Sequence, residues 1–369
     1  MVTSRDVARL AGVSQSTVSY VMSGRRSISP ETRRRVEDAI AELKFQPNAG
    51  ARALKSQRTQ VIGLVVPFGP SADTTGLLPF IETIASSARE RDHDVLLVTR
   101  DEGSAGLTRL ASRSLCDAIV LMDIEARDAR IPVAAALAMP VILIGLPADP
   151  AGLPCVDLDF DAAGRLAVAH LADDGHDRIA VIGHPPDIVA RDLNFLRRFR
   201  RGAAEEAWAR GLPCDIHELP ERGPAGVRAA VERALASRGR VGLVVPNTEV
   251  VPAVLQLVAG RNVSVVGLCP DVMAEATTPP VTNVSLEPRD VSRRAMNTLF
   301  RLLDRDPLTP SNPLPPGDPR RPTDPHTPSD PLTPRDPRRP TGLFTPIAPI
   351  AAIALIKPRL TRRQTSHPA

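Results

Sequence analysis

Aromatic residues are scarce in this chain of 369 residues, making up 3% of it, with a single tyrosine and a single tryptophan. The cores must therefore be built from Val, Ile, Leu and Ala. No apolar run approaches the ~20 residues that a membrane helix needs. The opening segment MVTSRDVARLAG also lacks the apolar core of a signal peptide. These absences argue against secretion and membrane insertion, and they predict a cytoplasmic protein.

Cysteine is equally rare, with four residues, no C-x-x-C pair and no histidine at zinc-binding spacing: Cys116, Cys155, Cys214 and Cys269. This usage predicts reduced, buried thiols and neither a disulfide framework nor a metal site. Enzyme motifs are missing too, since no G-x-G-x-x-G follows a strand and neither G-x-S-x-G nor G-K-S/T occurs. We therefore expect no catalytic residues, no metal and no cofactor.

Charge is unevenly distributed along the chain, although the net charge is only +4. The first 60 residues carry eleven basic and five acidic side chains, an excess of +6, so the remainder is slightly acidic. Such a distribution favours a small polyanion-binding head on a near-neutral body. The alternative is an ordinary solvated surface in a chain whose bases are mostly arginine, and charge alone leaves it open.

Residues 61–286 alternate short, unbroken apolar runs with amphipathic stretches. VIGLVVP (61–67), DVLLVT (94–99), AIVLMDI (118–124) and PVILIG (140–145) form one set. RIAVIG (178–183), VGLVVP (241–246) and VSVVGL (263–268) form a second. Helices are expected between them, for example at 77–92 and 196–210, and a further helix at 288–304. Uninterrupted strands alternating with helices predict parallel sheets covered on both faces, here as two doubly wound lobes.

Residues 306–349 differ in composition, because proline recurs at every third position from Pro307 to Pro340. The stretch 309–323 nearly repeats at 327–341. This spacing matches the three residues per turn of polyproline II and cannot bury a core. We interpret the segment as a duplicated spacer, disordered or in polyproline II. A ligand for a proline-recognising domain is the alternative.

The first sixty residues carry the functional signal. Ala8, Gly12 and Val18, with apolar residues around them, match the spacing of a helix-turn-helix, in which two helices cross at a small residue and glycine ends the first. The second helix then exposes a polar row that can enter the DNA major groove, where a glutamine such as Gln15 can bond adenine through two contacts. The alternative is a generic three-helix fragment.

The stretch TSRDVARLAGVSQSTVSYVMSG, followed by residues 28–67, resembles the head of the LacI/GalR (lactose-repressor/galactose-repressor) family. Residues 156–183, 244–249 and 263–268 resemble its regulatory core, which is like that of periplasmic sugar-binding proteins. The resemblance implies a fold with a small all-α helix-turn-helix head and an α/β core of two doubly wound parallel-sheet lobes. It also implies a hinge helix at 47–54, in which Leu54 would wedge into the minor groove. The alternative role for Leu54 is packing of the linker against the core.

On this basis we predict five segments. They are a DNA-binding head (1–46), a hinge and linker (47–60), a two-lobe core for effector binding and dimerisation (61–304), the proline-rich insertion (305–349), and a closing strand with a tail (350–369). The resemblance and the groove geometry together select these DNA-contacting residues: Thr3, Arg5, Ser14, Gln15, Ser16, Thr17, Ser19, Tyr20, Arg25, Asn48, Ala51 and Leu54. We expect phosphate contacts from Arg5, Arg25, Arg26, Arg33, Lys55 and Arg58.

Two departures from the family bear on specificity. Tyr20 stands where many relatives carry an arginine that can read guanine, so the operator should differ there. In the effector pocket, Asn247 matches the family, but Phe199 and Cys269 stand where an arginine and an aspartate are expected. A sugar effector is therefore doubtful, and an apolar metabolite, a protein partner or no effector are alternatives. The candidate effector residues, at strand ends and nearby, are Phe68, Asp101, Arg198, Asn247, Cys269 and Asp271.

The function predicted from these patterns is sequence-specific transcriptional regulation, as a repressor. The chain would bind a pseudo-palindromic operator as a homodimer or tetramer, with a small-molecule effector between the lobes. A solute-binding protein with the same core fold and no DNA function is the alternative. We also expect the lone Trp208 to pack against the core and His176 to lie in a loop.

Overall fold

The computed structural model describes residues 2–23, 27–45, 58–66, 74–99, 102–305 and 353–365. The N-terminal head is a bundle of three helices, α1 (Ser4–Ala11), α2 (Gln15–Ser23) and α3 (Pro30–Glu42). Gly12 ends α1 at a φ of 61°, a left-handed conformation that glycine adopts without strain. Arg35 of α3 donates hydrogen bonds to the carbonyls of Ala11 and Gly12. The third helix thus supplies hydrogen-bond donors to the carbonyls at the C-terminal end of α1.

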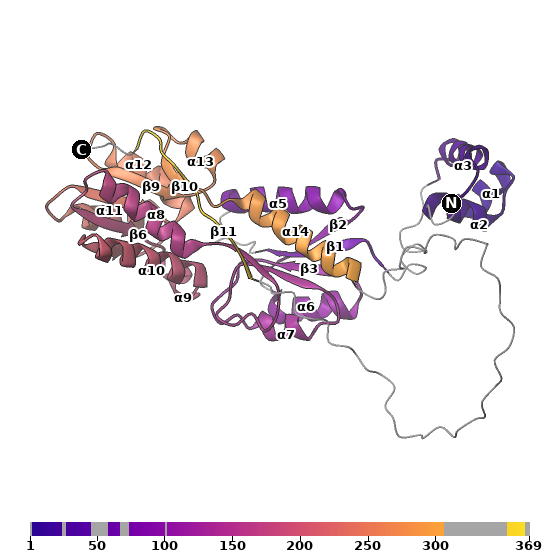
Figure 1. Ribbon diagram of the computed structural model, residues 1–369, viewed down its shortest axis with the longest axis horizontal. Helices are drawn as coiled ribbons and strands as arrows, with labels where there is room; N and C mark the ends of the chain where they lie inside the picture. The colour runs from indigo at the N-terminus through magenta and orange to yellow at the C-terminus, as the bar shows by residue number, and fades with distance from the viewer. Residues whose placement is uncertain are drawn as a thin grey trace, which may run out of the picture.

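The N-lobe is a six-stranded sheet in the order β11-β5-β4-β3-β1-β2, and every pairing in it is parallel. Its strands are β1 (Val61–Val66), β2 (Asp94–Thr99), β3 (Ala118–Leu121), β4 (Val141–Ile144), β5 (Cys155–Leu158) and β11 (Ile353–Ile356). Helices α5 (Thr74–Arg89) and α14 (Pro288–Arg305) cover one face, and α6 (Gly103–Ser112) and α7 (Arg130–Ala136) cover the other (Figure 1).

The C-lobe is a second six-stranded sheet, in the order β12-β10-β9-β8-β6-β7. Its strands are β6 (Arg178–Ile182), β7 (Cys214–His217), β8 (Val241–Val245), β9 (Ser264–Leu268), β10 (Thr282–Val284) and β12 (Leu360–Thr361). Helices α8 (Phe160–Asp173) and α10 (Asn194–Ala209) pack on one face. Helices α11 (Pro224–Leu235), α12 (Val251–Val258) and α13 (Asp271–Ala276) pack on the other. Two short helices, α9 (Pro186–Ala190) and η2 (Thr248–Val250), complete it.

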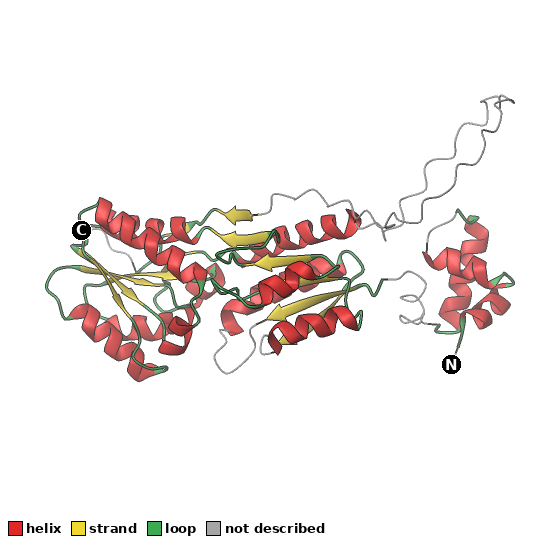
Figure 2. Cartoon of the chain, turned by 90° about the horizontal axis from the view of Figure 1, so that it is seen from below, coloured by secondary structure: helices red, strands yellow, loops and turns green. Residues whose placement is uncertain are grey.

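Figure 2 shows the two sheets as separate sets of strands, each with helices on both sides. The predicted fold class, a helix-turn-helix head with two doubly wound lobes, is confirmed. The prediction of a single closing strand in residues 350–369 is wrong in one respect. The segment forms two strands instead, because β11 adds in parallel to β5 of the N-lobe and β12 pairs antiparallel with β10 of the C-lobe. The chain thus crosses between the lobes three times, after β5, after β10 and after β11.

The cysteine prediction holds for three of the four thiols. Cys116, Cys155 and Cys269 are buried, whereas Cys214 on the edge strand β7 is only half-buried. All four are free, and burial raises the pKa of the Cys155 thiol to about 12. Within the described ranges, no helix is long and apolar enough to cross a membrane, and no group of three or more His, Cys, Asp or Glu side chains could hold a metal ion.

Candidate nucleic-acid interface and lobe junction

Helix α2 divides its side chains between the core of the head and its surface. Val18 is fully buried and Val21 is 8% exposed, and both pack with α1 and α3. This anchoring turns the polar row of the helix outward: Gln15, Ser16 and Tyr20 are exposed, and Thr17 and Ser19 are half-buried. The outward face of the helix therefore carries the predicted residues, all of them capable of hydrogen bonding, and their contact with a major groove remains a prediction.

Two residues predicted to contact DNA also cap the helices. The Ser14 hydroxyl accepts a hydrogen bond from the Thr17 N–H at 3.1 Å, at the start of α2. At the start of α1, both the N–H and the hydroxyl of Thr3 donate to the Asp6 carboxylate, at 2.9 and 2.8 Å. These two bonds lower the pKa of Asp6. Both caps hold the helix N-termini, whose positive dipole ends suit phosphates, in a fixed conformation.

The residues predicted to contact phosphates differ in their surroundings. Arg5 and Arg33 are exposed on the head. Arg58 instead donates to the carbonyl of Leu303 on α14 at 3.0 Å, so its guanidinium anchors the linker to the N-lobe. The other DNA-contact predictions lie outside the described residues: Arg25, Arg26, Asn48, Ala51, Leu54 and Lys55.

The junction between the lobes holds a buried ion pair that sequence reasoning did not find. Arg198 on α10 of the C-lobe pairs with Asp157 on β5 of the N-lobe, and the two residues are 8% and 7% exposed. Arg198 also contacts the Leu158 carbonyl at 3.4 Å, and its guanidinium lies 5.4 Å from the centre of the Phe160 ring. Burial raises the pKa of Asp157 to about 6, although Arg198 opposes the shift. The predicted effector residue Arg198 is thus engaged with the protein itself.

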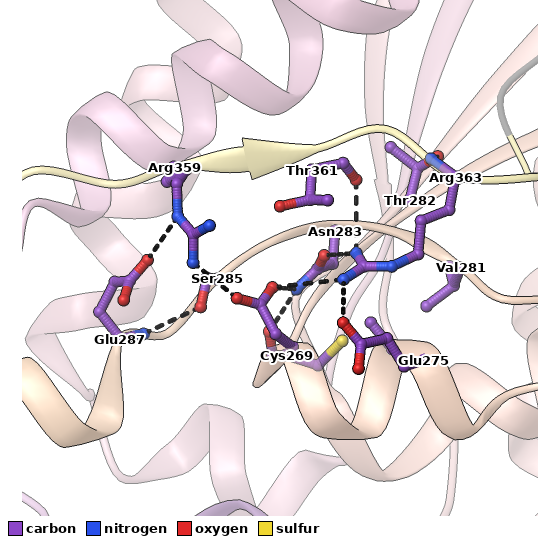
Figure 3. Close-up of polar contacts among 12 residues, drawn as sticks. Cys269, Glu275, Val281, Thr282, Asn283, Ser285, Glu287, Arg359, Thr361 and Arg363 are labelled. Atoms are coloured by element: carbon purple, nitrogen blue, oxygen red, sulfur yellow. Dashed lines mark hydrogen bonds and ion pairs between the residues drawn. The ribbon is translucent and has the colours of Figure 1, made fainter.

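Asp271, another predicted effector residue, is bound by the C-terminal segment. Figure 3 shows Arg359 and Arg363, the two arginines of this segment that contact it. Its carboxylate accepts hydrogen bonds from Asn283 at 3.0 Å and Arg359 at 2.7 Å, and it lies 3.6 Å from Arg363. Arg363 also pairs with Glu275 at 3.1 Å. These contacts fasten the segment after β11 to α13 and β10 of the C-lobe.

The remaining effector candidates differ in their surroundings. Asn247 lies two residues beyond the end of β8 and is 7% exposed, as expected for a residue near the carboxyl end of a central strand. Cys269 is fully buried in the C-lobe core, and its carbonyl accepts from Asn283 at 2.8 Å. Phe68 and Asp101 lie outside the described residues. The effector role of all six candidates remains a prediction.

A second contact between the lobes involves the loop after β3. Arg191 of the C-lobe pairs with Asp123 and, at 3.2 Å, with Glu125. The backbone N–H of Ala126 donates to the Asp192 carbonyl at 2.9 Å. The loop is held in shape by the buried Arg130, which bonds Asp128 and the carbonyls of Met122 and Asp123. No pattern in the sequence predicts this contact, because its residues become neighbours only when both lobes have folded.

The expectation that Trp208 packs against the core is wrong, since its side chain is 85% exposed. The buried stripe of α10 includes Phe199, Ala203 and Ala207, spaced by four residues, and Trp208 falls just outside it. His176 does follow the turn after α8, but it is 3% exposed, and its Nδ1 lies 2.8 Å from the Leu171 carbonyl. Burial lowers its pKa.

Three family models match the chain. "Bacterial regulatory proteins, lacI family" matches residues 3–48. "Periplasmic binding proteins and sugar binding domain of LacI family" matches 59–219, and "Periplasmic binding protein-like domain" matches 168–322. Together they cover the head and both lobes.

Several curated relatives are named HTH-type transcriptional regulators. CelR of Thermobifida fusca is 31% identical over 334 residues, which cover 81% of this chain and 90% of CelR. AglR of Rhizobium meliloti is 33% identical over 217 residues, covering 57% of this chain and 59% of AglR. MalR of Streptococcus pneumoniae is 34% identical over 189 residues, covering 49% and 57%. The chain thus matches less than two thirds of the length of AglR and MalR, and nearly all of CelR.

Solved structures share the fold. A lac repressor dimer bound to operator and the anti-inducer ONPF has a TM-score of 0.72 at 19% identity, over 99% of both chains. A complex of the regulator CelR with cellobiose has a TM-score of 0.57 at 22% identity, over 99% of this chain and 100% of that one. The order of head and lobes, the matching family models and the near-complete CelR alignment agree. The chain belongs to the LacI family of bacterial transcriptional regulators.

Proposed function

We propose that the protein is a transcriptional repressor that binds a pseudo-palindromic operator as a homodimer and works in the cytoplasm. The observation that carries this proposal is α2, whose Val18 and Val21 are anchored in the head while Gln15, Ser16 and Tyr20 are exposed. A helix presented in this way fits the major groove, and the excess of arginine in the head supplies the attraction to phosphates. Two heads related by a two-fold axis would read two inverted half-sites.

A steep salt dependence tests DNA binding. If five basic side chains of each head contact phosphates, a plot of log affinity against log salt concentration should have a slope of about −9 for the dimer. Arg33→Ala on α3 should reduce that slope by about 2 in the dimer, because each head loses one contact. The measurement is a titration of a selected operator at several salt concentrations, with Arg228→Ala, an exposed C-lobe arginine, as the control. A flat salt dependence would remove the DNA-binding proposal.

The dimer surface that we propose is formed by α5, β2 and α13. Leu78 on α5, Leu97 on the edge strand β2 and Val272 on α13 are 65%, 47% and 66% exposed. A second chain that covered these side chains would remove their apolar surface from water. A second copy fits this role, because it would bring two heads to one operator.

Charge reversal of this surface tests the dimer. Leu78→Glu combined with Val272→Glu should give a monomer in sedimentation, because four carboxylates, two from each protomer, would be buried in the interface without partners. Operator affinity should fall by at least tenfold, since the second head then binds without the benefit of a tether. Trp208→Glu is the control, because it changes an even more exposed apolar residue, on α10. Persistence of the dimer in the double variant would contradict the assignment.

We further propose that a small molecule between the lobes modulates DNA affinity. Support comes from the fold, since open α/β sheets bind ligands at the carboxyl ends of their strands. Among the described residues, the charged groups at this junction are engaged with one another, as in Arg198–Asp157 and Arg191–Asp123. This favours a ligand less polar than a sugar, which needs charged groups to bind its hydroxyls.

A further inference from the structure

We propose that Ser4 and Arg5 are positioning residues that fix the orientation of the Gln15 carboxamide, and that Gln15 thereby selects adenine over guanine. The inference rests on the proposed function, because it requires α2 to lie in the major groove. It adds Ser4, which no sequence argument selected, and it gives Arg5 a role beyond phosphate binding.

The Gln15 side chain is held at both ends by α1. Its Nε2 donates to the Ser4 hydroxyl at 2.8 Å, and its Oε1 accepts from the Arg5 Nε at 3.4 Å. Ser4 begins α1 and Gln15 begins α2, so these contacts join the N-termini of two helices that lie side by side in the head (Figure 1). The crossing is fixed from within by Val7 and Val18, which are both fully buried.

Arg5 and Ser4 constrain the orientation of the Gln15 carboxamide differently. An arginine side chain carries only donors, so it tolerates the oxygen of the carboxamide and not its NH₂ group. A serine hydroxyl can donate or accept, so Ser4 adapts to whichever atom faces it. Arg5 therefore decides which way the amide points, and Ser4 holds it there.

The hydrogen-bonding groups of the Gln15 carboxamide that α1 does not use match those of adenine. A carboxamide has two N–H donors and two lone pairs on its oxygen, and the contacts with α1 use one of each. One donor and one acceptor remain available to a base. Adenine offers an acceptor at N7 and a donor at N6 in the major groove, whereas guanine offers acceptors at both N7 and O6. A fixed amide would place its oxygen against the O6 of guanine, and a freely rotating side chain could avoid that contact.

The test measures base preference at one operator position. An operator is first selected from a random DNA library with the full-length protein, and Gln15→Ala then identifies the position at which preference relaxes. Binding is measured on operator pairs that differ there by A·T against G·C. Ser4→Ala and Arg5→Met should each lower the preference for adenine roughly three- to tenfold, the value of one hydrogen bond. Arg5→Met should also weaken binding to every sequence, because it removes a phosphate contact.

Two controls separate positioning from general effects. Arg9→Ala also removes an exposed arginine from α1, but Arg9 pairs with Asp6 and not with Gln15, so the adenine preference should stay unchanged. Ser4→Ala in a Gln15→Ala background should also leave the preference unchanged, because the residue that it positions is gone. Thermal melting of each variant confirms that the head remains folded.

The outcomes distinguish this inference from the proposed function. If Gln15→Ala relaxes one position but Ser4→Ala and Arg5→Met preserve the adenine preference, the positioning role is refuted and DNA reading by α2 stands. If Gln15→Ala relaxes no position, the inference fails because Gln15 reads no base. If selection yields no preferred sequence, the proposed function fails with it.

Discussion

Replacing Arg198 with methionine should destabilise the protein by about 3–5 kcal/mol at pH 8, because it leaves the Asp157 carboxylate buried without a counter-ion. The pair joins α10 of the C-lobe to β5 of the N-lobe, and both side chains are 10% exposed, so water cannot take over the lost contact. Urea unfolding of the full-length protein measures the effect. Arg222→Met is the matched control, because it breaks a more exposed pair with Asp187 and should cost less than about 1 kcal/mol.

The loss should depend on pH in a defined direction. The folded-state pKa of Asp157, about 6, is raised above its ordinary value of 3.8, so the folded protein holds this proton more tightly than the unfolded chain. The stability linked to that proton is complete below about pH 4 and is lost as the pH rises through about 6. Without Arg198 the pKa should rise further, so Arg198→Met should be milder at pH 5 than at pH 8.

A second substitution gives a rescue test. Arg198→Met combined with Asp157→Asn should recover much of the lost stability, since a neutral amide needs no counter-ion. A double variant no more stable than Arg198→Met, or a penalty independent of pH, would show that Arg198 acts mainly through packing on Phe160.

The regular elements could be predicted from sequence because they depend on local patterns. The unbroken apolar runs became central strands, such as β1, β6, β8 and β9, and the spacing of Ala8, Gly12 and Val18 became the crossing of α1 and α2. The edge strand β7 (Cys214–His217) was missed because it is short and half polar. It therefore shows neither the unbroken apolar run of a buried strand nor the periodicity of a helix.

What sequence could not supply are the contacts between distant charged side chains. Arg198 and Asp157 are 41 residues apart, and Arg359 and Asp271 are 88 apart. Spacing rules apply only within one helix or strand, so they say nothing about such pairs. Arginine is also so frequent in this chain that its position alone does not show which residues are paired. The same limit applies to Arg58, whose contact with α14 no spacing rule could indicate.

The crossing of α8 and α10 positions the buried pair, and it depends on two glycines. A Cβ on Gly202 would lie 2.0 Å from the Asp161 carbonyl oxygen, and a Cβ on Gly164 would lie 2.2 Å from that of Phe199. Both obstacles are backbone atoms of the facing helix, so no rotamer change could relieve them. The two helices therefore pack backbone to backbone, and this close approach holds Arg198, one turn before Gly202, within reach of Asp157.

Gly202→Ala should therefore destabilise the protein by about 3 kcal/mol or more, although alanine is the better helix former by about 1 kcal/mol. Ala204→Gly, at an exposed position on the same helix, is the control and should cost only about 1 kcal/mol. Because a displaced α10 would carry Arg198 away from Asp157, Gly202→Ala and Arg198→Met should be less than additive when combined. Full additivity in urea unfolding would mean that the ion pair survives the displacement, and stabilisation by Gly202→Ala would rule out the close crossing itself.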